Sequence, residues 1–303
     1  MKRIKKILWT LGVASGLLLT AGLAWSDVAP DPLNQGMSPA RKDSRVQMVS
    51  QDVFIHLGSE ECRVDASFLL HNRSLGSSIM EVGFPTGYKD EIKELKVWKN
   101  GKMLKTKSLV EKEIVDTDKE PVIYHWTLWN MHFAPGEKTN LKVSYRIKPR
   151  KNHDYIITPY RRFLDGMAKE ATGANTGSAE LKRIIKGMTS YSTGYIMVTG
   201  AGWYDTIEKA TVTIRHPKGA GILRWIEPAH HFTSSAKGIE WRFDYIKPDF
   251  DIKVEFSDTW TIDEEMTAVE KAIKTVGKKQ GLIEHLHYLK KMKQCLASGN
   301  CDK

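Results

Sequence analysis

The chain has 303 residues, of which 41% are hydrophobic and 27% are charged, and its formal net charge is +10 at pH 7. This composition is typical of a globular protein and excludes a largely disordered chain. Basic residues are spread along the sequence and mixed with acidic ones, so they do not form the clustered footprint of a nucleic-acid-binding protein. The length suits two sandwich-sized domains or one large domain.

Residues 1–26 have the pattern of a secretory signal peptide. Basic residues at positions 2–6 precede an uncharged apolar run over 7–23, and the small residues Ala24 and Ser26 favour cleavage before Asp27. No cysteine lies at this boundary, so lipidation is not expected. The alternative is an uncleaved transmembrane anchor, for which the apolar run is short. Without the leader, 42 basic and 36 acidic residues remain, a net charge of +6. We expect an exported protein, periplasmic or secreted.

The chain contains three cysteines and no CxxC redox motif. Cys295 and Cys301 enclose a short, turn-rich segment, and an oxidising compartment favours a disulfide between them. In the alternative pairing, Cys62 bridges to one of these two residues. Cys62 also alternates with apolar residues along a predicted strand, which is typical of a buried free thiol.

An extended segment over 27–48 leads into a first β block over 49–159. Apolar and polar residues alternate here with period two, as in strands that bury one face. Asn100-Gly101 predicts a hairpin turn, and the segment 134–137 predicts a second turn. The predicted strands cover residues 49–57, 62–70, 79–84, 92–98, 122–133 and 141–147.

A helical hairpin is predicted over 160–190, between the first and second β blocks. Leu181, Ile184, Ile185 and Met188 form one apolar stripe at helical spacing. A second β block follows over 191–258, where the segments from Ile239 to Phe256 alternate most regularly. Its predicted strands cover residues 195–199, 210–214, 222–226, 239–245 and 250–256.

The tail over 259–303 is predicted to be an amphipathic helix. Thr261 and Glu264 have the spacing of a capping box, and an apolar stripe follows; Gly277 and Gly281 weaken or bend the helix. Its basic face would lie on a membrane or on a partner, or it would be the solvated face of a helix packed against its own β-sandwich. The lysines of this face are Lys271, Lys274, Lys278, Lys279, Lys290, Lys291 and Lys293.

No catalytic, cofactor-binding or metal-binding residue is predicted. The sequence lacks the nucleophile elbow, the zinc-protease helix motif and the phosphate-binding loop, and its histidine spacings match no ligand motif. The seven tryptophans of the mature chain suit either core packing or platforms that stack on sugars. By their lysine-bearing neighbours, Trp98 and Trp129 are expected to be the most exposed of the seven.

Three segments give the chain a resemblance to a family of exported bacterial proteins whose domain has no assigned function. They lie over 122–146, over 195–214 and over 249–254, and the second contains the strand-end motif Thr199-Gly200-Ala201-Gly202-Trp203. The resemblance spans most of residues 49–256 and implies a β-rich exported domain. It transfers no catalytic residue to this chain.

The sequence therefore predicts a mainly β protein: two β-sandwich-like blocks, an inserted helical hairpin and a C-terminal amphipathic helix. The favoured function is a non-enzymatic envelope or extracellular module that binds a protein partner or assists an assembly. One alternative is a protein that binds or acts on carbohydrate or cell wall. Another is association with a membrane surface through the C-terminal helix. No cofactor and no nucleic-acid partner are expected.

Overall fold

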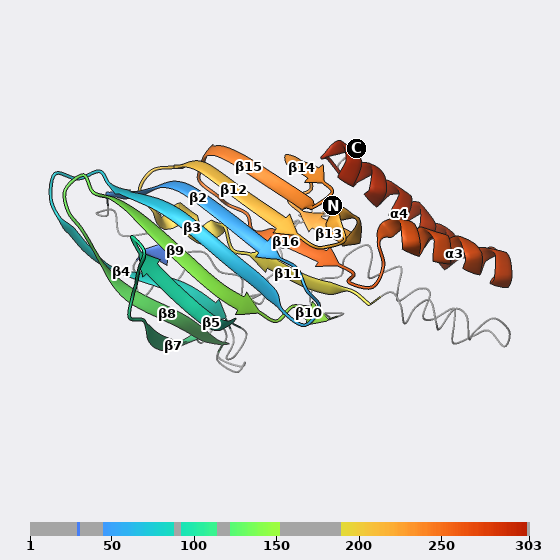
Figure 1. Cartoon of the computed structure of the whole chain (residues 1–303), viewed down its shortest axis with the longest axis horizontal. Helices are drawn as coiled ribbons and strands as arrows, with labels where there is room; N and C mark the ends of the chain where they lie inside the picture. The colour runs from blue at the N-terminus through green and yellow to red at the C-terminus, as the bar shows by residue number, and fades with distance from the viewer. Residues whose placement is uncertain (1–28, 31–44, 88–91, 114–121, 152–188, 302–303) are drawn as a thin grey trace, which may run out of the picture.

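The computed structural model describes residues 29–30, 45–87, 92–113, 122–151 and 189–301, and within these ranges it is mainly β with two α-helices near the C-terminal end (Figure 1). The predicted leader and the stripe of the predicted helical hairpin lie outside the described residues. The strands are β1 (Ala29–Pro30), β2 (Val46–His56), β3 (Cys62–Asn72), β4 (Ser78–Gly87), β5 (Ile92–Lys99), β6 (Lys102–Met103), β7 (Lys107–Glu113), β8 (Val122–Phe133), β9 (Lys138–Ile147), β10 (Arg150–Lys151), β11 (Tyr191–Tyr195), β12 (Ile207–Arg215), β13 (Leu223–Glu227), β14 (Phe232–Ser235), β15 (Gly238–Ile246) and β16 (Ile252–Phe256). The helices are the 3-10 helices η2 (Val198–Gly202) and η3 (Gly219–Ile222) and the α-helices α3 (Ile262–Val276) and α4 (Gln280–Ser298).

Eight strands form one large sheet in the order β14-β15-β12-β2-β3-β9-β5-β6. Most neighbours are antiparallel, but β12 runs parallel to β2, with Val212 opposite Val53. Strands of the two predicted β blocks therefore lie in the same sheet, joined along the β12–β2 pair.

Two four-stranded sheets pack against one face of the large sheet. Their strand orders are β1-β4-β8-β7 and β10-β11-β16-β13. Phe84 of β4 meets Tyr145 of β9 edge to face, with ring centroids 5.1 Å apart. Farther along the large sheet, the amide of Gln51 donates to the hydroxyl of Tyr195 in β11 at 3.0 Å. The large sheet is therefore one layer of a sandwich, and the smaller sheets make the other (Figure 1).

Strict alternation along the central strands builds the core. In β3 the apolar residues of the Cys62 face are buried, while Arg63 and Ser67 on the opposite face are exposed. Cys62 is a free thiol, which leaves the pairing of Cys62 with a tail cysteine without support. Burial raises the pKa of this thiol to about 11, so it stays protonated at neutral pH.

Most predicted strands are present, and one is misplaced. The predicted strand over 122–133 has the bounds of β8, and Asn100-Gly101 joins β5 to β6 with positive φ at both residues. The predicted strand over 195–199 is wrong, because β11 ends at Tyr195 and residues 198–202 form η2. The glycines of this segment favour a tight turn over extended backbone. Strands β7 and β14 were not predicted.

The C-terminal tail forms two helices. The capping box at Thr261 and Glu264 is confirmed, and Gly277 ends α3 with φ 87°. Val269, Leu282 and Leu289 are buried, whereas all seven lysines of the predicted basic face are exposed. The apolar stripe thus packs within the protein and leaves a solvated basic face. Neither helix among the described residues has the length and apolar character needed to cross a bilayer.

The disulfide between Cys295 and Cys301 is confirmed; it joins the end of α4 to the segment that follows. Because this loop spans only six residues, we expect the double variant Cys295→Ser/Cys301→Ser to lose about 2 kcal/mol of unfolding free energy. Urea denaturation measures the loss, and the reduced wild-type chain should give the same midpoint. An unchanged midpoint in both samples would show that the bond contributes nothing to stability.

Candidate functional site

One face of the large sheet remains open to solvent and contains a cleft of about 500 Å³. Its lining crosses four neighbouring strands, β2, β3, β9 and β5, and the volume lies within the range of small-ligand sites. The polar residues of the lining are Ser50, Asp52, Ser67, Asn140 and Lys142, and Trp98 lies beside them.

The register of the sheet places these residues in two rows. Asp52 pairs with Ser67, Ser67 with Lys142, and Lys142 with Trp98, which makes one row across four strands. Three interstrand spacings give this row a length of about 14 Å. The next row contains Ser50, Leu69 and Asn140. Strands far apart in sequence thus bring together a mostly polar floor.

The hairpin turn at Asn100 borders the cleft and is held against β9. The backbone N–H of Asn140 donates to Oδ1 of Asn100 at 2.9 Å, and the N–H of Asn100 donates to the carbonyl of Asn140 at 2.8 Å. Trp98, two residues before Asn100, is half-buried, and Nζ of Lys142 lies over its ring, 5.8 Å from the ring centre. A fixed turn and the Trp98 side chain therefore form one wall.

A rigid apolar tip lies at the same end of the large sheet. We define the loop tip as residues 73–77, which join β3 to β4, the first two residues of β4, Ser78 and Ile79, and the adjoining turn Ala134–Pro135. Leu75 is 99% exposed and Ile79 is 78% exposed. Asn72, which is fully buried, fixes both segments, because its side-chain amide donates to the carbonyls of Gly76 and Ala134, each at 2.9 Å. Oδ1 of Asn72 also accepts the backbone N–H of Ser74 at 3.1 Å.

The loop tip and the cleft are close together. Leu69, on the cleft floor, precedes Asn72 by three residues along β3, a separation of about 10 Å. The helices α3 and α4 lie at the opposite end of the long axis (Figure 1). The molecule therefore has one end with candidate binding features and another that is closed by helices.

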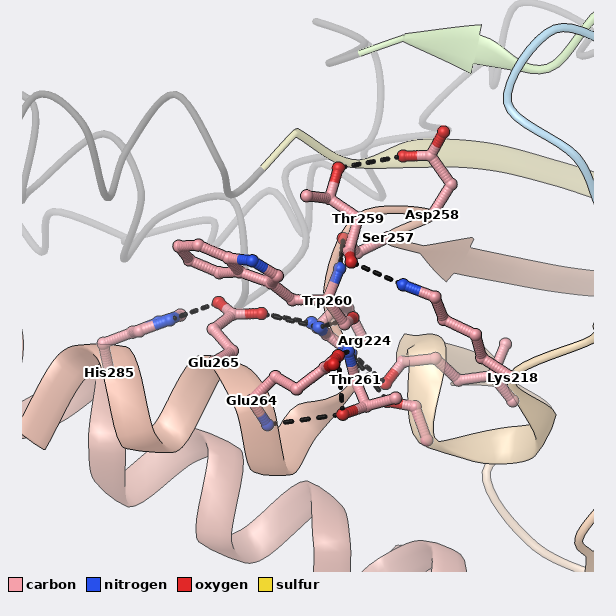
Figure 2. Close-up of polar contacts among 12 residues, drawn as sticks. Lys218, Arg224, Ser257, Asp258, Thr259, Trp260, Thr261, Glu264, Glu265 and His285 are labelled. Carbon is pink, nitrogen blue, oxygen red and sulfur yellow. Dashed lines mark hydrogen bonds and ion pairs between the residues drawn. The ribbon is translucent and has the colours of Figure 1, made fainter.

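A buried charge cluster attaches the helices to the β13 strand (Figure 2). Nη2 of Arg224 lies 2.6 Å from Oε2 of Glu265, and Oε1 of Glu265 lies 2.7 Å from Nε2 of His285; all three side chains have no solvent exposure. Arg224 also donates to the carbonyl of Trp260 at 2.6 Å, and the Tyr288 hydroxyl donates to the carbonyl of Arg224. With no access for a substrate, this cluster is an anchor and not a reaction centre.

The two tryptophans that the sequence predicts to be exposed, Trp98 and Trp129, differ in exposure in the structure. Trp98 is half-buried beside the cleft, but the expectation that Trp129 is exposed is wrong, because only 2% of it is accessible. Trp129 faces the core from β8, opposite Val82 of β4. Trp203, which ends the glycine motif, is also buried.

The described residues contain no group of three or more histidine, cysteine or acidic side chains able to hold a metal ion. Sequence patterns missed the loop tip and the anchor. Asn72-Arg73-Ser74 is an ordinary turn sequence, and the single leucine that follows it does not indicate a binding surface. Arg224 gives a stronger sequence signal for the anchor, because a charged residue within an apolar strand needs a buried partner.

Comparison with known protein families finds no match, and comparison with curated proteins finds none either. Among solved structures, the chain is similar to a Legionella pneumophila protein for which nutrient binding has been suggested, at 12% identity and a TM-score of 0.47, over 92% of this chain and 94% of that one. It is also similar to an M1 zinc metallopeptidase from Deinococcus radiodurans, at 10% identity and a TM-score of 0.31. That alignment covers 76% of this chain and 42% of the peptidase. Similarities of this size do not establish a shared function.

Proposed function

We propose that the chain is an exported, non-enzymatic envelope protein that binds a protein partner through its loop tip. The observation that carries the proposal is the exposure of Leu75 and Ile79 in a loop tip that the buried Asn72 holds in place. A loop whose backbone is already fixed loses little conformational entropy when its exposed side chain enters a partner's pocket. Export rests on the leader over residues 1–26, whose basic and apolar parts follow the signal-peptide pattern.

The charges around the loop tip favour a protein partner over a lipid surface. Arg73 forms an ion pair with Glu208 at 2.9 Å, and Lys99 forms one with Glu137 at 3.2 Å. Such a rim has both signs of charge, like the polar rim of a protein interface. Attraction to anionic lipid requires an excess of basic residues.

The variant Leu75→Asp tests this function. Because the side chain is almost fully exposed, we expect the unfolding free energy to change by less than about 0.5 kcal/mol. We expect affinity for the partner to fall by about tenfold or more, since a carboxylate would be buried in an apolar pocket. The measurement is photo-crosslinking from position 75 in the native envelope, followed by mass spectrometry and by titration of the identified partner.

Ile283→Asp is the matched control, because Ile283 is a partly exposed isoleucine on α4. It should leave partner affinity unchanged. The proposal fails if positions 75 and 283 capture the same proteins, or if Leu75→Asp binds the partner like wild type. If wild type binds anionic vesicles and Leu75→Asp loses this binding, the loop tip binds a membrane and not a protein partner.

A further inference from the structure

The cleft on the large sheet contains polar side chains that the described protein does not use. Ser50, Asp52 and Ser67 make no side-chain hydrogen bond or ion pair with another residue in the described part of the chain. Asp52 and Ser67 are exposed at the cleft floor. Together they offer two hydroxyl groups, which both donate and accept, and one carboxylate, which accepts.

The backbone of the cleft floor is fully engaged. Of the four strands that cross it, β2, β3 and β9 are interior strands with a neighbour on each side, and β5 is paired with β9 and β6. A peptide cannot add to this surface as a further strand, because such binding needs a free sheet edge. Recognition here must therefore use side chains.

Trp98 supplies an apolar surface beside the polar floor. Nζ of Lys142 lies over its half-buried ring, 5.8 Å from the ring centre, and the Asn100 turn follows two residues later. An aromatic ring flanked by hydroxyl, amide and charged groups suits a ligand with an apolar face and a polar rim. The C–H face and hydroxyl edge of a sugar ring have this character.

The charge of the cleft disfavours strongly ionic ligands. Asp52 and Lys142 are the charged residues of its lining, and their charges cancel. A polyanion such as a nucleic acid or an acidic polysaccharide would meet the carboxylate of Asp52 without the basic excess that phosphate or carboxylate chains require.

We propose that this cleft binds a neutral oligosaccharide, which lies along the row from Asp52 to Trp98 and stacks one ring on Trp98. The row is about 14 Å long, so it accommodates several linked sugar rings across the strands. Asp52 is the single carboxylate of the lining, whereas hydrolysis of a glycosidic bond commonly uses two facing carboxylates. The site therefore binds sugar without cleaving it.

The test uses the mature full-length chain and three neutral hexasaccharides, namely a β-1,4-glucan, an α-1,4-glucan and a chitin fragment. Each is titrated to millimolar concentration by isothermal calorimetry. We expect one of them to bind, Trp98→Ala to weaken that binding by about tenfold or more, and Trp98→Phe to retain most of it. Ser67→Trp is the second variant, because it fills the cleft from an exposed position and should abolish binding without unfolding the protein.

Tyr245→Ala is the matched control, since Tyr245 is 72% exposed and lies outside the cleft lining. It should bind like wild type, and so should Leu75→Asp, which separates this site from the protein-binding function. The proposal is overturned if none of the three sugars binds, or if Trp98→Ala and Ser67→Trp bind like wild type. It is also overturned if polygalacturonate, an anionic chain, binds more tightly than every neutral sugar.

Discussion

Replacing Glu265 by glutamine is expected to lower the unfolding free energy by about 3–5 kcal/mol. The carboxylate bridges Arg224 and His285, and all three side chains are excluded from water. Without it, the buried guanidinium of Arg224 loses its ion pair with Glu265, and breaking a buried ion pair by removing one partner is costly. Urea denaturation at neutral pH measures the loss.

Asp263→Asn is the control for this prediction, because it removes a carboxylate from the same helix. The ion pair of Asp263 with Lys293 spans 2.6 Å, but both side chains are more than half exposed. We expect a loss of less than about 1 kcal/mol, as solvent screens such pairs. Similar losses for Glu265→Gln and Asp263→Asn would contradict the role of the cluster as an anchor.

The second large effect is expected for Gly238→Ala, with a loss of about 3–5 kcal/mol. Gly238 begins β15 with φ 146°, a region that only glycine populates readily. A Cβ atom there would lie 1.9 Å from the carbonyl oxygen of Ile214 in β12. Strands β12 and β15, which are hydrogen-bonded here, would have to move apart to make room for the methyl group. Backbone strain and steric overlap would therefore both lower the stability of the variant.

Gly101→Ala distinguishes these two causes. Gly101 also has positive φ, at 80°, but no atom lies within 4 Å of the position of an added Cβ. We expect a loss of only about 1 kcal/mol, the conformational cost alone. Thermal and urea unfolding of both variants measure the difference. If Gly238→Ala were as mild as Gly101→Ala, the close approach of β12 and β15 would be wrong.

Much of the local structure follows from the sequence. Alternation over 62–70 identifies β3 and its buried face, and the spacing of Thr261 and Glu264 identifies the start of α3. These features depend on neighbouring residues only. Trp129 shows where alternation fails: both faces of β8 carry large residues, so the pattern does not distinguish the inward face.

The candidate site could be predicted only in part. Trp98 is expected to be exposed, but it is half-buried, as are Trp126, Trp225 and Trp260. Its alignment with Asp52 and Lys142 depends on the register of four strands, which no local pattern fixes. The anchor could also be predicted only in part. Glu265 and His285 lie on apolar helix faces, where a polar side chain indicates a buried partner but not which residue it is. That partner, Arg224, lies on a strand 41 residues before Glu265.

The parallel pairing of β12 with β2 also sets the order in which the protein is completed. Val53 and Val212 are neighbours in the sheet although 159 residues separate them in the chain. Until β12 is available, residues 50–56 of β2 lack a partner on the side away from β3, and such an edge can recruit strands of other chains. Fragments that end before residue 207 are therefore prone to aggregate, and a chain growing from its N-terminus completes its main sheet only after residue 215 has been added.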